Sequence, residues 1–108
     1  TAIRDYIHVS DLSDAHYKVL KKISKTKSSI IVNCGYNRGI SVNAVAKEFI
    51  KQSKKEVKVL YEKRRPGDLA VVIADNNKLK KIVKWSPKYF KLSTIVKSCI
   101  KWEKRIHR

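Results

Sequence analysis

Three charged side chains from two distant parts of the chain form the most informative chemical pattern. The segment RDYIHVSD begins with Arg4, and the segment RRPGD contains Arg65 and Asp68. An arginine guanidinium is a planar fork of N–H donors, which suits phosphate oxygens better than the compact charge of lysine does. Arg4 and Arg65 lie 61 positions apart, so a fold that brings them together would form a clamp for a pyrophosphate. Asp68 would then be free to accept hydrogen bonds from sugar hydroxyls.

A second interpretation of the same residues involves no ligand. The Pro-Gly pair favours a turn across which Arg65 and Asp68 would pair at the surface, with Arg4 and Asp5 merely solvated. Exposed ion pairs of this kind are common and contribute little to stability. The residue types alone therefore leave both interpretations open.

The helices that must position these residues follow from the spacing of apolar side chains. Helical periodicity predicts a first helix capped by Ser10, a second capped by Ser41, and a short third opened by Asp75 or Asn76. A last helix carries apolar residues from Ile95 to Ile106. We expect Trp85 and Trp102 to be core anchors of the last two helices.

Strands are expected between these helices. The opening residues are strand-like, residues 29–33 predict a short buried strand, and the alternating residues 57–62 predict another. Residues 69–74 are extended or irregular. The resulting order, β-α-β-α-β-α-α, is that of an α/β domain with no internal repeat and no long linker.

Composition excludes several classes of protein. The chain has 108 residues, 26 Lys plus Arg against 9 Asp plus Glu, a net charge of +17, and 43% hydrophobic residues. This apolar content rules out a purely disordered basic tail, and the length allows one domain. No apolar run approaches the roughly 18 residues of a membrane span, and no signal peptide is apparent, so a cytoplasmic location is expected. The chain opens on Thr1 like the middle of a protein, so we expect a fragment or a processed chain.

The cysteines and histidines predict no metal site. Cys34 and Cys99 have no close Cys or His at ligand spacing, which favours two free, packed thiols in a reducing compartment, with a disulfide as the alternative. His8, His16 and His107 show no metal-binding spacing. We expect His8 to be a packed or hydrogen-bonded strand residue.

The positive charge suggests nucleic acid as a rival class of partner. The lysines, however, are spread over the exposed positions of every predicted helix and do not gather in one stripe with interleaved aromatic residues. Only weak, salt-sensitive, sequence-independent binding to nucleic acid is expected of such a surface.

Three longer stretches make the sequence similar to a known family. They are RDYIHVSDLSDAH, SIIVNCGYNRGISVNAVAKEF and YEKRRPGDLAVVIADNNKLKKIVKWSPKY. In register, and over essentially the whole chain, they resemble the C-terminal third of the UDP-glucose 4-epimerases, which are extended short-chain dehydrogenase/reductases. The blocks RDYIHVSD and RRPGD, in this order and about 60 residues apart, are more specific together than either is alone.

The resemblance implies a fold and a set of binding residues. Residues 1–108 would be a single C-terminal substrate-binding segment of α/β class, contributing to a Rossmann-like parallel sheet and to a small substrate-binding subdomain. Arg4 and Arg65 would contact the diphosphate of a UDP-sugar, and Asp68 would hold the ribose of uridine. Val72 falls where the family gates the sugar pocket, and a small residue there resembles sites that also admit N-acetylated sugars.

The resemblance also implies that catalysis and NAD binding lie outside this chain. The family interconverts UDP-glucose and UDP-galactose by NAD-dependent oxidation and reduction at C4, with a Gly-rich turn for NAD and a catalytic Tyr-x-x-x-Lys. The chain has only 3 glycines and no such turn. Tyr17 and Lys21 do spell Tyr-x-x-x-Lys, but chance alone yields about one such match in this lysine-rich chain, so we predict a structural role for both.

These implications predict that the isolated chain is inactive and binds no cofactor. The family works at full length as a homodimer, and this region packs on the NAD-binding domain. Apolar faces left uncovered predict poor solubility of the isolated chain. Another nucleotide-sugar epimerase, dehydratase or decarboxylase of the same family remains the alternative for the reaction.

Overall fold

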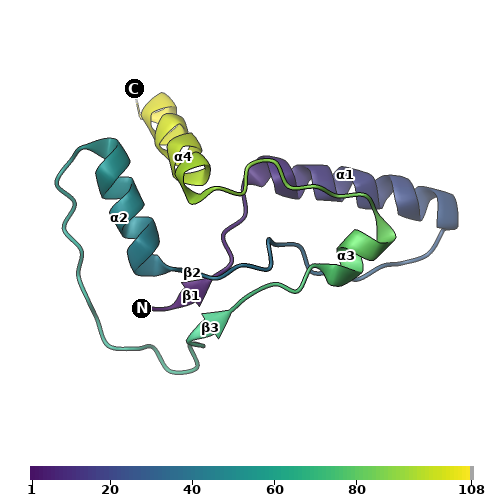
Figure 1. Cartoon of the computed structure of the whole chain (residues 1–108), viewed down its shortest axis with the longest axis horizontal. Coiled ribbons are helices and arrows are strands. Elements are labelled where there is room, and N and C mark those ends of the chain that lie inside the picture. The colour runs from purple at the N-terminus through teal and green to yellow at the C-terminus, as the bar shows by residue number, and fades with distance from the viewer. Residues whose placement is uncertain (108) are drawn as a thin grey trace.

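The computed structural model describes residues 1–107 as four helices joined to a small sheet (Figure 1). This confirms the expected α/β class. The elements in chain order are β1 (Ile3–Arg4), α1 (Val9–Thr26), β2 (Ile40–Ser41), α2 (Val42–Ser53), β3 (Val71–Val72), α3 (Asn77–Ile82) and α4 (Leu92–Ile106).

The sheet joins three distant parts of the chain. Its strand order is β2-β1-β3, with β1 antiparallel to β2 and parallel to β3. In the parallel register Arg4 lies opposite Val72. The sheet is therefore the place where the N-terminal segment meets the segment that follows the long connection after α2 (Figure 1).

The starts of the helices follow the predicted caps, with one exception. The side chain of Ser41 accepts a hydrogen bond from the backbone N–H of Ala44 at 3.0 Å, and Asn76 precedes α3, as predicted. The prediction of Ser10 as the cap of α1 is wrong. His8 is the cap, and its Nδ1 accepts a hydrogen bond from the backbone N–H of Ser10 at 3.0 Å. His8 is buried and hydrogen-bonded as expected, but it lies in a cap and not in a strand.

Two predicted strands are wrong. Residues 29–33 are irregular, and Ile31 is 86% exposed. Residues 57–62 belong to the irregular connection between α2 and β3, and all of them are exposed. Both segments have the side-chain pattern of a strand, but a strand also needs a partner for its backbone N–H and C=O groups. Residues 69–74, by contrast, contain β3, in agreement with the expected extended conformation.

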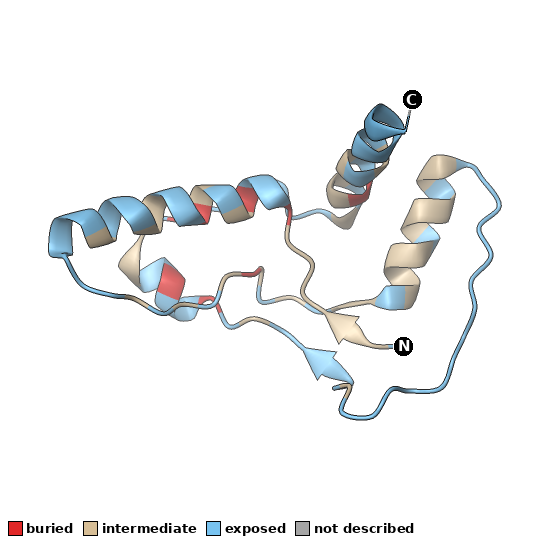
Figure 2. Cartoon of the chain, turned by 180° about the vertical axis from the view of Figure 1, so that it is seen from behind, coloured by how far each residue is buried: buried red, intermediate tan, exposed pale blue. Residues whose placement is uncertain are grey.

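The buried core is small, and most of it forms one cluster, while Val96 is buried separately on α4. Ala15, Leu79 and Trp85 form its cluster, between α1, α3 and the turn after α3 (Figure 2). Trp85 is thus confirmed as a core residue, although it lies beyond the end of α3. The prediction for Trp102 is wrong, because this residue is 57% exposed. It lies in the last part of α4, where every described residue from Lys101 onward is exposed.

The chain is less compact than most domains of its length. Its radius of gyration is 16.7 Å, whereas a compact chain of this size has a radius of about 13 Å. Large apolar side chains such as Leu60, Tyr61 and Leu69 are more than half exposed. The expected uncovered apolar faces are therefore present. Within residues 1–107, no helix is both long and apolar enough to cross a membrane.

Both cysteines are free thiols, as predicted. Cys34 is half-buried beside the core, and burial together with the negative charges of Asp5 and Asp11 raises the pKa of its thiol. The expectation that Cys99 is packed is wrong, because Cys99 is exposed on α4. Among the described residues, no group of three or more His, Cys, Asp or Glu side chains could hold a metal ion.

Candidate functional site

The structure brings Arg4, Arg65 and Asp68 together, and we call these three residues the arginine–aspartate cluster. Arg4 Nη2 donates to Asp68 Oδ1 at 2.9 Å, and Arg65 Nη2 donates to Asp68 Oδ2 at 3.3 Å. The side chains of Arg4 and Asp68 are 29% and 31% exposed, and that of Arg65 is 86% exposed. A solute can therefore reach all three groups.

A tight turn positions Arg65 beside Asp68. The backbone N–H of Asp68 donates to the carbonyl of Arg65 at 3.1 Å, and Gly67 has a φ of 79°. Proline at the second position and a glycine with positive φ at the third are the signature of a type II turn. The local sequence thus accounts for this half of the cluster, and the predicted pairing of Arg65 with Asp68 is confirmed.

The sheet positions Arg4. Pairing of β1 with β3 places Arg4 opposite Val72, four residues after Asp68, and Arg4 Nη1 also donates to the carbonyl of Ile3 at 2.8 Å. The guanidinium keeps further N–H donors beyond these two bonds. The interpretation in which Arg4 is merely solvated is therefore wrong, because Arg4 shares the Asp68 carboxylate with Arg65.

Two hollows adjoin the cluster. One, of about 510 Å³, is lined by Arg64, Arg65 and Asp68 among others, and the second, of about 410 Å³, is lined by Arg4 and Val72 with their neighbours. Arginine forks suit an anion with several oxygens, and the Asp68 carboxylate suits a hydroxyl group. The arrangement can bind a molecule that carries both groups.

Asp5 is a charged residue whose role the sequence did not reveal. Its Oδ1 accepts a hydrogen bond from the backbone N–H of Tyr36 at 3.0 Å, and its Oδ2 accepts from those of Ala74 at 3.3 Å and Arg38 at 3.4 Å. The interpretation of Asp5 as a solvated residue is therefore wrong. Its sequence position beside Arg4 was the only signal, and its three partners lie far away along the chain.

Asp11 is a second carboxylate that holds segments together. It is 3% exposed and accepts hydrogen bonds from the Tyr36 hydroxyl at 2.6 Å and from the backbone N–H groups of Lys88 at 2.9 Å and Tyr89 at 3.0 Å. Burial acts to raise the pKa of Asp11, but these hydrogen bonds hold it below its usual value. Burial and the bond to Asp11 raise the pKa of Tyr36. Neither group is thus tuned to exchange a proton near neutral pH.

Two of the three glycines are packed closely against other parts of the chain. A Cβ on Gly35 would lie 2.6 Å from Ala74 Cβ, and one on Gly39 would lie 2.5 Å from Ile3 Cγ2. Both glycines thus allow this chain to pack on itself and do not open its backbone to a phosphate. Tyr17 is 60% exposed on α1, with the Lys21 ammonium 5.5 Å from its ring centre.

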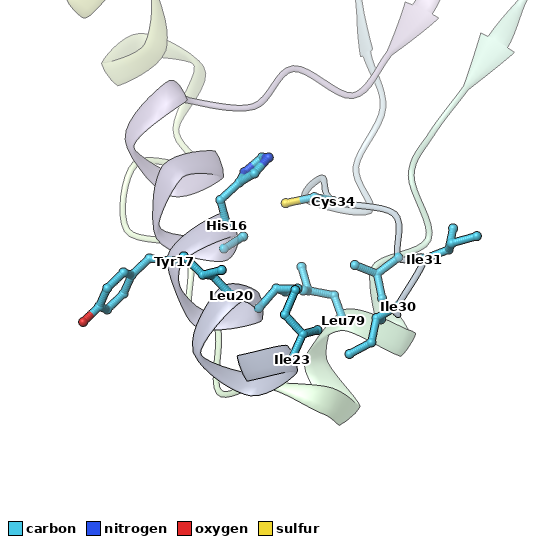
Figure 3. Close-up of a pocket in the computed structure, with 11 residues that line it drawn as sticks. His16, Tyr17, Leu20, Ile23, Ile30, Ile31, Cys34 and Leu79 are labelled. Carbon is cyan, nitrogen blue, oxygen red and sulfur yellow. The ribbon is translucent and has the colours of Figure 1, made fainter. Parts of the chain in front are cut away.

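An apolar groove of about 660 Å³ lies between α1, α3 and residues 30–34 (Figure 3). Leu20, Ile23 and Ile30 line it together with Leu79, which also belongs to the core. The groove shares no lining residue with the arginine–aspartate cluster. It is therefore a separate feature of the molecule.

The chain is similar to known nucleotide-sugar epimerases. No family model matches the chain. The chain is 39% identical to a UDP-glucose 4-epimerase of Azospirillum brasilense, an alignment that covers 100% of this chain and 31% of that protein. It is 40% identical to UDP-arabinose 4-epimerase 1 of Arabidopsis thaliana, over 100% of this chain and 25% of that protein.

Solved structures of the same kind share the fold of this chain. A UDP-Glc/GlcNAc 4-epimerase from Campylobacter jejuni is 42% identical, with a TM-score of 0.86 over 97% of this chain and 32% of that one. A UDP-glucose-4-epimerase from Stenotrophomonas maltophila, solved with NAD and formylated UDP-arabinopyranose, is 30% identical, with a TM-score of 0.89 over 98% of this chain and 31% of that one. The chain thus spans between a quarter and a third of these proteins and matches their C-terminal part.

Proposed function

This chain is a homologue of the C-terminal part of UDP-glucose 4-epimerases, and on that premise we propose that it is the UDP-sugar-binding portion of a nucleotide-sugar 4-epimerase. The proposed reaction of the whole enzyme is the interconversion of UDP-glucose and UDP-galactose, with NAD as the cofactor. NAD and the catalytic groups are assigned to the portion outside residues 1–108, because Gly35 and Gly39 are occupied by internal packing. The chain alone is expected to be inactive.

The observation that carries this proposal is that Arg4, 64 positions away in sequence, joins the neighbouring Arg65 on the Asp68 carboxylate. Two guanidinium groups match the two negative groups of a diphosphate. In the structure the Asp68 carboxylate pairs with both arginines. On binding, the diphosphate would take over those donors, and Asp68 would accept hydrogen bonds from the ribose hydroxyls.

A chimaeric enzyme tests the proposal. The chain replaces the matching C-terminal portion of the A. brasilense UDP-glucose 4-epimerase, with which it aligns over its full length. We expect this chimaera to convert UDP-galactose to UDP-glucose, and the chain alone to show no conversion with added NAD. Turnover by the chain alone would contradict the assignment of catalysis to the other portion.

Direct binding provides a second test that does not depend on chimaera activity. UDP is titrated into the chimaera, and binding is measured by isothermal titration calorimetry. Saturable binding is expected, and it should weaken strongly in Arg4→Ala, which loses the charge-assisted contact with the diphosphate. A folded chimaera that shows neither activity nor saturable UDP binding would refute the proposal.

Arg65 is expected to contribute to substrate affinity. In the chimaera, Arg65→Ala should lower kcat/KM for UDP-galactose by about tenfold, the lower end of the 1.5 to 3 kcal/mol expected for a charge-assisted contact, because this side chain is largely exposed. Arg105→Ala removes the same charge from the exposed end of α4 and should change kcat/KM less than about twofold. Steady-state kinetics measure both variants, and unchanged KM and kcat/KM in Arg65→Ala would count against the clamp.

Val72 is expected to widen the choice of sugar. It is 44% exposed and lies opposite Arg4 in the second hollow, where a small side chain leaves room beside the sugar. The chimaera should therefore also convert UDP-N-acetylglucosamine, and Val72→Tyr should abolish that activity while sparing UDP-galactose. The C. jejuni relative is itself described as a UDP-Glc/GlcNAc 4-epimerase. Val71→Tyr, on the adjacent residue, provides the control, and equal loss of both activities in Val72→Tyr would contradict the gate.

The apolar groove is the proposed contact with the NAD-binding portion of the enzyme. Its lining includes Leu20, Ile23 and Ile30, and the neighbouring Ile31 is 86% exposed (Figure 3). Covering such a surface favours association with a further apolar surface. We therefore expect the isolated chain to aggregate despite its charge of +17. From the resemblance to the family, and not from this groove, we propose that the whole enzyme is a homodimer in the cytoplasm.

Two other functions remain testable. The A. thaliana relative is named a UDP-arabinose 4-epimerase, so UDP-arabinose should be assayed beside UDP-galactose, and the same assay mixtures show any dehydratase or decarboxylase product. A nucleic-acid-binding role would appear as sequence-selective binding that survives physiological salt. The basic residues are dispersed over the chain, so only salt-sensitive, non-selective binding is expected.

A further inference from the structure

We propose that Asp5 is a positioning residue for the sugar-nucleotide site, an inference that rests on the proposed function. Asp5 follows Arg4 directly, and both line the hollow that also contains Val72. Its carboxylate accepts three backbone hydrogen bonds, so its acceptors are engaged within the protein. Asp5 therefore acts on the ligand through the residues that it holds in place.

The three N–H donors come from two segments, one next to β2 and the other next to β3, the two strands that pair with β1. Tyr36 and Arg38 lie in the loop before β2, and Ala74 lies two residues after β3. Each strand pairing in the sheet is only two residues long, so few backbone bonds fix the strands relative to one another. The Asp5 carboxylate extends this connection beyond the point where strand pairing stops.

The bond to Ala74 matters most for the site. This bond fixes the end of the segment that carries Val72. Val72 is paired with Arg4 in the sheet, and both residues line the same hollow. The space around the carboxylate is also closely filled, since a Cβ on Gly35 would lie 2.7 Å from Asp5 Oδ2. The distance between the Arg4 guanidinium and the sugar side of the hollow thus depends on this carboxylate.

The chemistry of the substitution to asparagine follows from the donors. Asparagine keeps one carbonyl oxygen, but it presents an NH₂ group in place of the other oxygen. Depending on the orientation of the amide, its NH₂ group would then face either the backbone N–H of Tyr36 or the backbone N–H groups of Arg38 and Ala74, and those donors would lose their acceptor. Because charge-assisted hydrogen bonds depend on the distance and direction between donor and acceptor, a small shift of this segment is expected to weaken the binding of substrate.

The test compares Asp5→Asn with Asp11→Asn in the chimaera. Asp11 is the matched control because its carboxylate also accepts three hydrogen bonds, one of them from Tyr36, and it lines neither hollow. Both variants should lower the midpoint of urea unfolding. Only Asp5→Asn should raise KM for UDP-galactose, by roughly tenfold, with kcat changed less than about threefold.

Asp5→Glu is the second variant. It retains the charge, but its longer side chain displaces the carboxylate from the three backbone donors, so it should raise KM as well. An unchanged KM in Asp5→Asn, an equal rise in Asp11→Asn, or a failure of both Asp5 variants to fold while Asp11→Asn folds would overturn the inference. Failure of the proposed function is distinguishable, because the unsubstituted chimaera would then neither bind nor convert UDP-galactose.

Discussion

Replacing Arg4 with alanine is expected to lower kcat/KM of the chimaera for UDP-galactose by roughly two orders of magnitude. Arg4 would lose its charge-assisted contact with the diphosphate, which is worth about 1.5 to 3 kcal/mol. The Asp68 carboxylate, whose Oδ1 accepts from Arg4 at 2.9 Å, would in addition face the incoming anion with only the exposed Arg65 to balance it. The effect of Arg4→Ala should therefore exceed that of Arg65→Ala.

Two further variants make the Arg4 result specific. Arg105→Ala removes the same charge from the exposed end of α4 and should change kcat/KM less than about twofold. Arg4→Lys keeps the charge but loses the fork, so it should restore only part of the activity. If Arg4→Ala retained the KM and kcat/KM of the unsubstituted chimaera, Arg4 would have no part in binding the diphosphate.

The largest effect on stability is expected for Asp11→Ala. This change removes the common acceptor of the Tyr36 hydroxyl and of the backbone N–H groups of Lys88 and Tyr89. These donors lie in a part-buried site, where each one left without a partner costs about 1 kcal/mol, so the free energy of unfolding should fall by about 3 kcal/mol. Urea unfolding of the chimaera measures the loss.

The matched control lies on the same helix. Asp14 forms an exposed ion pair with Lys18 at 3.0 Å, and Asp14→Ala should cost no more than about 0.5 kcal/mol. A loss of similar size in both variants would show that the Asp11 hydrogen bonds do not hold the loops in place.

The contribution of Asp11 should also depend on pH. Hydrogen bonds hold its pKa in the folded chain below the usual value of about 3.9, so the folded state favours the ionised carboxylate. The unfolded chain binds the proton more readily, and stability from this group is present in full above about pH 4 and is lost as the pH falls further. The difference in unfolding free energy between the unsubstituted chimaera and Asp11→Asn should therefore shrink on acidification.

The helices were the most predictable part of the fold. Their apolar periodicity is a local property, and Ser41 caps α2 through its own side chain as expected. The C-terminal ends were harder to predict, because α1 and α2 are followed by the capping residues Lys27 and Lys54, which adopt the left-handed conformation where glycine would be usual. The error at Trp102 has a different cause. This residue follows the helical spacing of the apolar side chains, but no other described element covers that end of α4.

The strands were less predictable, because a strand is not a local structure. Residues 29–33 and 57–62 have suitable side chains, yet within the described chain no second strand satisfies their backbone groups. Val71 and Val72, which carry a weaker pattern, do form β3, because β1 lies alongside them. Side-chain pattern indicates which segments are able to pair, whereas the partner decides which of them do.

The sequence by itself determined the local half of the candidate site. Arg65, the Pro-Gly turn and Asp68 are adjacent in the chain, and the φ of 79° at Gly67 is the conformation that glycine adopts most readily. The tertiary structure decided the other half. Arg4 reaches Asp68 only because β1 pairs with β3, and Asp5 acquires its role only from backbone groups 31 to 69 positions away. Contacts between residues so far apart depend on how the whole chain packs, and for that reason residue types and spacing could suggest the clamp without showing what holds it together.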